Sequence, residues 1–204
     1  MNDESWKRKY ALLITLTISV ISAFILLFLM ICFSFLNIRT MEESMLVGLT
    51  LPTVISLYLL PKLFQRIFDP KINRPANKMF QRWKAILFLT GFVVLYVMIC
   101  WQKFESISMM LVIILHYTVV SLGEEFTYRK LILGFLDRRY KTWIAVVASA
   151  FMFAFILHIS EDFVINLLIR FPMGIVFGCI AVKTDTIAYT IVLHTIYNLT
   201  ILIL

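Results

Sequence analysis

The sequence predicts an all-α protein, a polytopic bundle of about seven transmembrane helices. Three observations carry this prediction: 61% of the 204 residues are hydrophobic, the mean hydropathy is +0.92, and uncharged apolar runs recur along the chain. A soluble domain has a much smaller apolar fraction, whereas a helix that crosses a bilayer needs ~20 apolar residues. The runs, of which the sixth is interrupted by Arg170, are 10–36, 44–61, 85–101, 106–123, 142–160, 163–182 and 186–204.

The first two runs contain no charged residue, which favours a scaffold role for both. The run 10–36 is too long for the apolar segment of a secretory signal peptide, so we expect it to stay in the protein as a membrane anchor. Within the run 44–61, Pro52 and Pro61 should kink or end the helix because proline lacks the backbone N–H that a helix interior needs.

The lysines and arginines are divided unequally between alternate loops. Almost all of those outside the apolar runs fall on the side of the N-terminus, whereas the opposite side carries only Arg39 and Lys103. By the positive-inside rule, the N-terminus is cytoplasmic and the protein is a multi-pass protein of the cell membrane. This distribution accounts for the net charge of +7 through topology and lipid headgroups, so we expect no nucleic-acid partner.

Two adjacent carboxylates, Glu124 and Glu125, follow directly on the fourth run. An ionised group at the centre of a membrane helix costs about 2.5–3.5 kcal/mol on insertion scales, so the pair needs partners or a purpose. Arg129 is four residues after Glu125, on the same helical face, and is expected to form a structural ion pair with it. Glu124 points about 100° away and has no partner on its own helix.

Three polar residues in later runs can meet Glu124. His158 lies in the fifth run, and His194 and Asn198 lie four residues apart, on one face of the last helix. With the turn at residue 140, Glu124 and His158 lie at nearly the same depth of an antiparallel helix pair, with a mismatch of about 3 Å. For His116, in the fourth run, the simplest interpretation is a structural hydrogen bond to a backbone carbonyl or to a neighbouring helix.

A buried carboxylate with two imidazoles suits the activation of water. Glu124 with His158 could hold a water that attacks a peptide carbonyl, while His194 and Asn198 could stabilise the oxyanion. The same groups could instead bind a divalent metal such as zinc, and the sequence does not decide between these alternatives. HExxH, GxSxG and GxGD patterns are absent from the sequence, which disfavours serine and aspartyl intramembrane proteolysis.

The ordered set Glu124-Glu125-x-x-x-Arg129, His158 and His194-x-x-x-Asn198 resembles the CPBP family of CAAX-processing and bacteriocin-processing (Abi-type) intramembrane endopeptidases. The resemblance covers 106–204, expected to be the catalytic core, and leaves 1–105 as N-terminal helices and a basic loop with a scaffold role. One position departs from the pattern, because the family has Phe four residues before the histidine and this chain has Ala154 there.

The resemblance implies an endopeptidase whose partners are the lipid bilayer and a peptide or membrane-protein substrate, cut near its C-terminus or within a leader. It also implies a bacterial member that acts in bacteriocin self-immunity or peptide maturation, with Glu124 and His158 activating water. The alternative is a non-catalytic immunity or scaffold protein that uses the polar cluster to hold helices together. A transporter with Glu124 as a proton site is weaker, since the chain shows no repeated halves.

Overall fold

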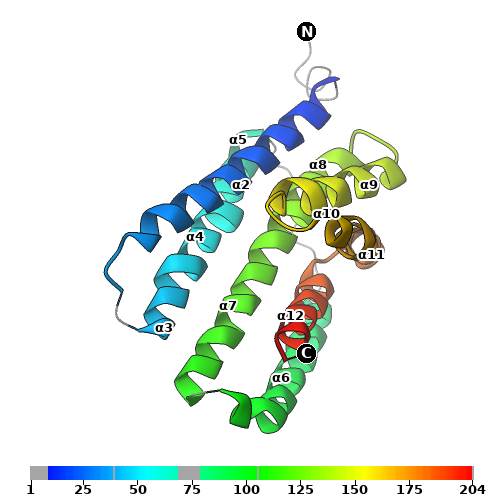
Figure 1. The fold of residues 1–204 in the computed structure, drawn as a ribbon. Helices are drawn as coiled ribbons and strands as arrows, with labels where there is room; N and C mark the ends of the chain where they lie inside the picture. Colours follow the sequence, from blue (N-terminus) through cyan, green and yellow to red (C-terminus); the bar gives the residue numbers. More distant parts are fainter. Residues whose placement is uncertain (1–8, 39, 69–78, 105, 204) are drawn as a thin grey trace.

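The computed structural model describes residues 9–38, 40–68, 79–104 and 106–203 (Figure 1). Within these residues the fold is all α-helical, as predicted. Five helices are long and apolar enough to cross a membrane, and two apolar helices are shorter. The long helices are Ala11–Ser34, Met41–Phe68, Trp83–Lys103, Ile107–Asp137 and Phe163–Thr184, and the shorter ones are Thr142–Leu157 and Ala188–Leu202.

Most of the long helices are built from α-helical segments joined by π-helical turns. The α-helical segments are α2 (Ala11–Ser34), α3 (Met41–Glu43), α4 (Leu51–Val54), α5 (Leu60–Phe68), α6 (Met79–Cys100), α7 (Ile107–Glu125), α8 (Gly134–Asp137), α9 (Thr142–Met152), α10 (Phe163–Ile165), α11 (Phe171–Thr184) and α12 (Ala188–Ile203). The π-helical segments are η1 (Ser44–Thr50), η2 (Ile55–Leu59), η5 (Phe126–Leu133), η6 (Phe153–Leu157) and η7 (Asn166–Arg170), and η4 (Trp101–Lys103) is a short 3₁₀ turn.

The two prolines of the second helix do not end it, contrary to one of the two outcomes expected from the sequence. Pro52 and Pro61 are each the second residue of the α-helical segment that follows a π-helical one. A proline is tolerated in the first turn of an α-helical segment, and π-helical turns occur as local irregularities inside longer helices. The helix therefore runs without a break from Met41 to Phe68.

The helix Ile107–Asp137 lies at the centre of the fold (Figure 1). α12 packs against both α7 and α6, α9 packs against α11 and η5, and α2 packs against η2 and η6. Two hydrogen bonds fasten the N-terminal helices to η5: the hydroxyls of Ser19 and Tyr128 are 2.9 Å apart, and Thr127 Oγ1 donates to the carbonyl of Leu57 over 2.6 Å. The first half of the chain thus fixes the segment that follows the glutamate pair.

Small residues bring α9 and α11 close together. A Cβ on Gly174 would lie 3.1 Å from the Cβ of Ala150, and one on Gly178 would lie 3.0 Å from Cγ1 of Val146. A Cβ at either position would require its neighbour to move by a few tenths of an ångström, so the two glycines favour this close helix separation.

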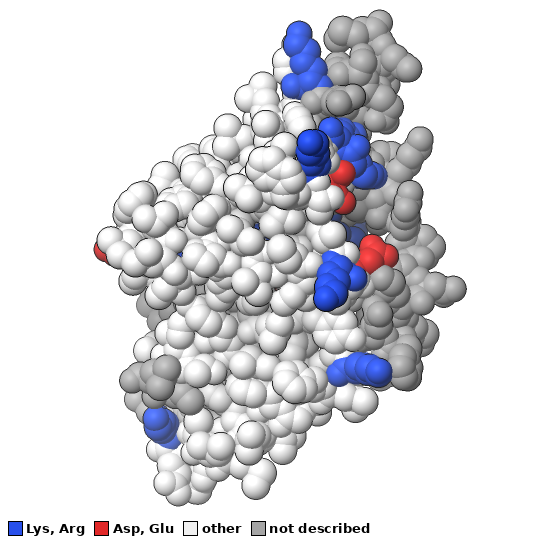
Figure 2. Space-filling view, turned by 90° about the vertical axis from the view of Figure 1, so that its right-hand side faces the viewer, with Lys and Arg blue, Asp and Glu red and all other residues white. Residues whose placement is uncertain are grey.

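Charged side chains are unevenly placed on the surface. On the face shown in Figure 2, most of the described lysines and arginines lie in the upper part, toward the end where the described chain begins, and wide areas without charged side chains separate them from the lower end. Many large apolar side chains are exposed around the bundle, such as Phe24 (66%) and Met98 (70%). Such a surface belongs in lipid, and the chain is a multi-pass membrane protein.

Candidate active site

The glutamate pair forms the last two residues of α7, where the helix changes to the π-helical segment η5. Both side chains are buried: 6% of Glu124 and none of Glu125 is exposed. Two carboxylates inside a membrane bundle require compensation from neighbouring groups. The groups that provide it come from α9, η5 and α12.

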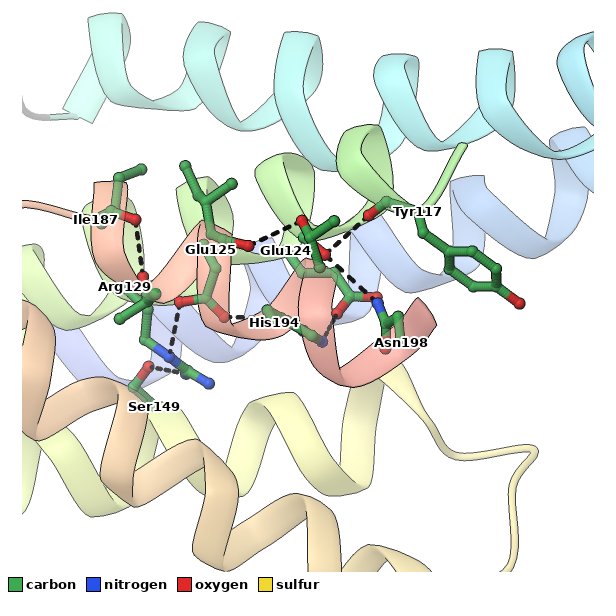
Figure 3. Close-up of polar contacts among 12 residues, drawn as sticks. Tyr117, Glu124, Glu125, Arg129, Ser149, Ile187, His194 and Asn198 are labelled. Carbon is green, nitrogen blue, oxygen red and sulfur yellow. Dashed lines mark hydrogen bonds and ion pairs between the residues drawn. The ribbon is translucent and has the colours of Figure 1, made fainter. Parts of the chain in front are cut away.

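His194 of α12 lies between the two glutamates (Figure 3). Its Nδ1 is 3.0 Å from Oε1 of Glu125, and its Nε2 is 3.4 Å from Oε2 of Glu124. Glu124, which has no partner on its own helix, therefore finds one on the last helix. When Nδ1 donates its proton to Glu125, Nε2 of a neutral imidazole can accept a proton from the Glu124 carboxyl group. Nε2 of an imidazolium can instead donate a proton to the Glu124 carboxylate.

Glu125 is held on both of its oxygens. His194 contacts Oε1, and Oε2 is 3.4 Å from Nε of Arg129, the ion pair expected four residues along the helix. Arg129 Nη1 also donates to Oγ of Ser149 over 3.4 Å, and Ser149 in turn donates to the carbonyl of Tyr128 over 2.6 Å. Ser149 was not singled out from the sequence, because a serine within an apolar helix carries no pattern that marks it.

Asn198 continues the polar face of α12 beyond His194. Its Nδ2 donates to Oγ of Ser121 over 3.4 Å, and Ser121 donates to the carbonyl of Tyr117 over 2.8 Å (Figure 3). Ser121 precedes Glu124 and Glu125 by nearly one helical turn on α7, so the amide of Asn198 lies beside the glutamate pair. The contact to Ser121 is long, which leaves the amide N–H available to a stronger acceptor.

Among the described residues, His158 makes no direct polar contact with this cluster. It directly follows η6 and is half-buried, and in the described part of the chain no hydrogen bond or ion pair joins its side chain to Glu124 or His194. Its neighbour is Phe153, whose ring centroid is 5.1 Å from that of His158 and 5.9 Å from that of His194. The structure thus brings Glu124 and His194 into contact, and it places an aromatic ring against both histidines.

The π-helical turn η6 gives the departure at Ala154 a structural explanation. Phe153 is five residues before His158, and a π-helical turn brings residues five apart into the relation that residues four apart have in an α-helix. Phe153 is buried (1% exposed) and also lies under the guanidinium of Arg129, with Cζ 4.8 Å from the ring centroid. The ring therefore takes the place that a phenylalanine at position 154 would have in a regular helix.

A short hydrogen-bond chain holds the backbone of His158. Asn166, which is 3% exposed, donates through Nδ2 to the carbonyl of His158 over 2.8 Å. Arg170 donates to Oδ1 of Asn166 over 2.8 Å and pairs with Glu161 at 3.5 Å. Arg170, the charge that interrupts the sixth apolar run, thus pairs with a carboxylate and supports the loop that carries His158.

The donor set does not form a metal-binding cluster among the described residues. A catalytic zinc takes three protein ligands that converge on one point. Here both nitrogens of His194 face carboxylates, Arg129 places a cation against Glu125, and no hydrogen bond or ion pair joins His158 to these groups in the described part of the chain. The residues in this arrangement therefore suit proton transfer and do not fit a three-ligand metal site.

The comparison with protein families agrees with the motifs. Residues 106–200 match the family model described as Type II CAAX prenyl endopeptidase Rce1-like, which confirms the resemblance to CAAX-processing endopeptidases. The matched range contains both glutamates, Arg129 and both site histidines. Comparisons with curated proteins and with solved structures found no match.

Proposed function

Since residues 106–200 match the family model of Rce1-like membrane proteases, we propose that the chain is an intramembrane endopeptidase that hydrolyses a peptide bond with water activated by Glu124. The observation that carries the proposal is the contact of His194 with both buried carboxylates, at 3.0 Å and 3.4 Å. Glu125 contacts both His194 and Arg129, whereas the contact of Glu124 with His194 uses one of its two oxygens.

The proposed reaction begins when Glu124 accepts a proton from a water held between its carboxylate and His158. The water oxygen bonds to the carbonyl carbon of the substrate, and the carbonyl becomes a tetrahedral oxyanion. His194 and Asn198, one turn apart on α12, donate hydrogen bonds to that oxyanion. The C–N bond then breaks, the leaving amine takes the proton from Glu124, and the products are a carboxylate and an amine.

Glu125 and Arg129 act as positioning residues in this proposal. Their ion pair, together with the bond from Glu125 to Nδ1 of His194, fixes the ring so that Nε2 faces Glu124. A buried charge pair of this kind has a defined geometry only while both partners are present. We assign neither residue to a step in which a bond of the substrate forms or breaks.

The proposed setting is a cell membrane with the N-terminus in the cytoplasm, where the substrate is an apolar peptide or a membrane protein. The unequal distribution of lysine and arginine supports the orientation. Bacteriocin self-immunity or peptide maturation in a bacterium is the role that the resemblance to the bacteriocin-processing family supports.

A second candidate is a non-catalytic scaffold, favoured by the contacts of Glu125 with both Arg129 and His194. Glu124→Gln distinguishes the two functions, because glutamine keeps the shape and a hydrogen bond to His194 but cannot accept the proton. The test is cleavage of a pool of apolar membrane peptides by the wild-type protein and by the variant, matched for insertion and melting temperature. Loss of cleavage in the variant supports the protease. Equal protection of cells against a bacteriocin by the wild-type protein and the variant supports the scaffold.

A further inference from the structure

His158 begins the turn that joins η6 to α10, and its backbone leaves the helical path there. The backbone angles of His158 are φ −100° and ψ 33°, outside the α-helical range. Its carbonyl accepts two hydrogen bonds, from the backbone N–H of Glu161 over 3.0 Å and from Nδ2 of Asn166 over 2.8 Å. Asn166 is the first residue of η7, so its side chain ties the turn to the following helix.

The neighbours of Asn166 fix the orientation of its amide. The side chain is buried (3% exposed), and Arg170 donates to its Oδ1 over 2.8 Å. A guanidinium can only donate a hydrogen bond, and a backbone carbonyl can only accept one. The amide must therefore turn Oδ1 to Arg170 and Nδ2 to the carbonyl of His158.

Arg170 is itself held by the turn that carries His158. Its Nη2 is 3.5 Å from Oε2 of Glu161, which lies three residues after His158. Asn166 and Arg170 thus contact the turn at two points, a backbone carbonyl and a carboxylate. A charged side chain within an apolar membrane run is costly, so Arg170 needs a role that justifies its place.

The position of the His158 imidazole depends on this turn. The backbone of His158 sets the direction of its side chain, and the imidazole packs edge-on against Phe153, with ring centroids 5.1 Å apart and an angle of 83° between the planes. The ring of Phe153 also contacts that of His194, with centroids 5.9 Å apart. A displacement of the turn would therefore move the imidazole relative to Phe153 and His194.

We propose that Asn166 and Arg170 are positioning residues for the cleavage reaction. They hold the backbone of His158, and thereby keep its imidazole beside Phe153, in the place from which it holds the reacting water with Glu124. Neither residue takes part in a step that forms or breaks a bond of the substrate. The inference rests on the proposed function and adds two residues of η7 to the groups on which it depends.

Two variants remove the hold on His158, and a third is the matched control. Asn166→Leu removes the donor at nearly constant volume and adds no charge. Arg170→Met leaves Asn166 in place but frees its amide, and it serves if Asn166→Leu does not fold. Asp162 accepts a hydrogen bond from the backbone N–H of Ile165 over 2.9 Å, so Asp162→Ala weakens the same turn without removing the bond from Asn166 to His158.

The first measurement reports the position of His158 without any substrate. The chain has three histidines, so protein labelled with ¹³C at Cε1 of histidine gives three NMR signals, each assigned by its own His→Gln variant. Because the ring of Phe153 shields the imidazole according to distance and angle, Asn166→Leu and Arg170→Met should shift the signal of His158 and leave that of His116 in place. An unchanged His158 signal, or an equal shift in Asp162→Ala, would overturn the proposal.

The second measurement is the cleavage of a peptide by samples of equal melting temperature. We expect kcat of Asn166→Leu to fall about tenfold, less than the roughly 10²-fold that a displacement of about 1 Å can cost, with KM nearly unchanged. Asp162→Ala should keep kcat close to the wild-type value. Equal falls in the two variants, or an effect confined to KM, would contradict a positioning role.

The two measurements separate this inference from the proposed function. A shifted His158 signal with unchanged kcat would refute the inference, while loss of cleavage in Glu124→Gln would still support the protease. If the wild-type protein cleaves no peptide, the proposed function fails, and the histidine signals still decide whether Asn166 and Arg170 hold His158.

Discussion

Two histidines of this protein, His116 on α7 and His194 on α12, are buried in apolar helices to a similar degree, with 8% and 3% exposed. His116 Nδ1 lies 2.9 Å from Oγ1 of Thr50. Because that hydroxyl donates its own proton to the carbonyl of Met45, the imidazole is the donor. His194 instead faces a carboxylate with each nitrogen.

The difference between the two histidines lies in their partners. A hydrogen bond between neutral groups contributes about 0.5–1.5 kcal/mol to stability and moves no charge. The cluster around His194 contains two carboxylates and a guanidinium, so the loss of one member leaves a buried charge without compensation. Burial alone therefore does not mark a reactive histidine, whereas contact with buried carboxylates does.

Of the variants that test the difference between the two histidines, His194→Gln is expected to have the largest effect on peptide cleavage. The variant keeps a hydrogen-bonding side chain but loses the imidazole that contacts both glutamates, so peptide cleavage should fall by about 10³-fold, at the upper end of the range for loss of one oxyanion donor. The measurement is kcat on a cleaved peptide. His116→Gln is the matched control and should keep kcat within a few-fold; equal losses in the two variants would remove the distinction drawn here.

Arg129→Met should lower the free energy of unfolding by about 3 kcal/mol, because it removes the cation that compensates the fully buried Glu125. Thermal or denaturant unfolding in a fixed detergent measures the effect. The double variant with Glu125→Gln should recover part of the loss, since the uncompensated charge is then removed as well. If the double variant does not regain any of the lost free energy of unfolding, Arg129 stabilises the fold through its contact with Phe153 instead.

Asn198→Ala tests whether the polar face of α12 stabilises the oxyanion. If the amide stabilises the oxyanion, kcat should fall about 10²-fold with little change in KM. Ser121→Ala removes the 3.4 Å contact that Asn198 makes in this structure and the hydrogen bond of Ser121 to its own helix, and we expect it to change kcat far less. A larger loss for Ser121→Ala than for Asn198→Ala would assign Asn198 a packing role.

Thr50→Val gives the smallest expected effect. It removes the acceptor for His116 at nearly constant volume and should cost about 1 kcal/mol of stability, with cleavage by the folded protein unchanged. A melting curve and a kcat measurement on the same sample test both parts. Loss of kcat at full folding would contradict the structural interpretation of His116.

Much of the site follows from helical periodicity in the sequence. Spacing by four residues predicted the ion pair of Glu125 with Arg129, which the structure confirms, and the shared face of His194 and Asn198. The hydrogen bond of His116 to a neighbouring helix is also confirmed. The first two features lie within a single helix, and the third needs only one polar side chain within an apolar run. Both kinds of pattern can be recognised in a sequence.

The position of His158 could not be derived in the same way. The depth estimate assumed a regular α-helical rise between Glu124 and His158, but the π-helical segments η5 and η6 lie between them and change both rise and rotation. The contacts of Phe153, Ser149 and Asn166 depend on that altered register and on the close approach of α9 and α11. No pattern in one sequence specifies where a π-helical turn occurs.

The most direct test of the account is peptide cleavage by three proteins of equal melting temperature: wild type, Glu124→Gln and His116→Gln. The account predicts cleavage by the wild type and by His116→Gln, and none by Glu124→Gln. Cleavage by Glu124→Gln at the wild-type rate would contradict the assignment of Glu124 as the base that activates water.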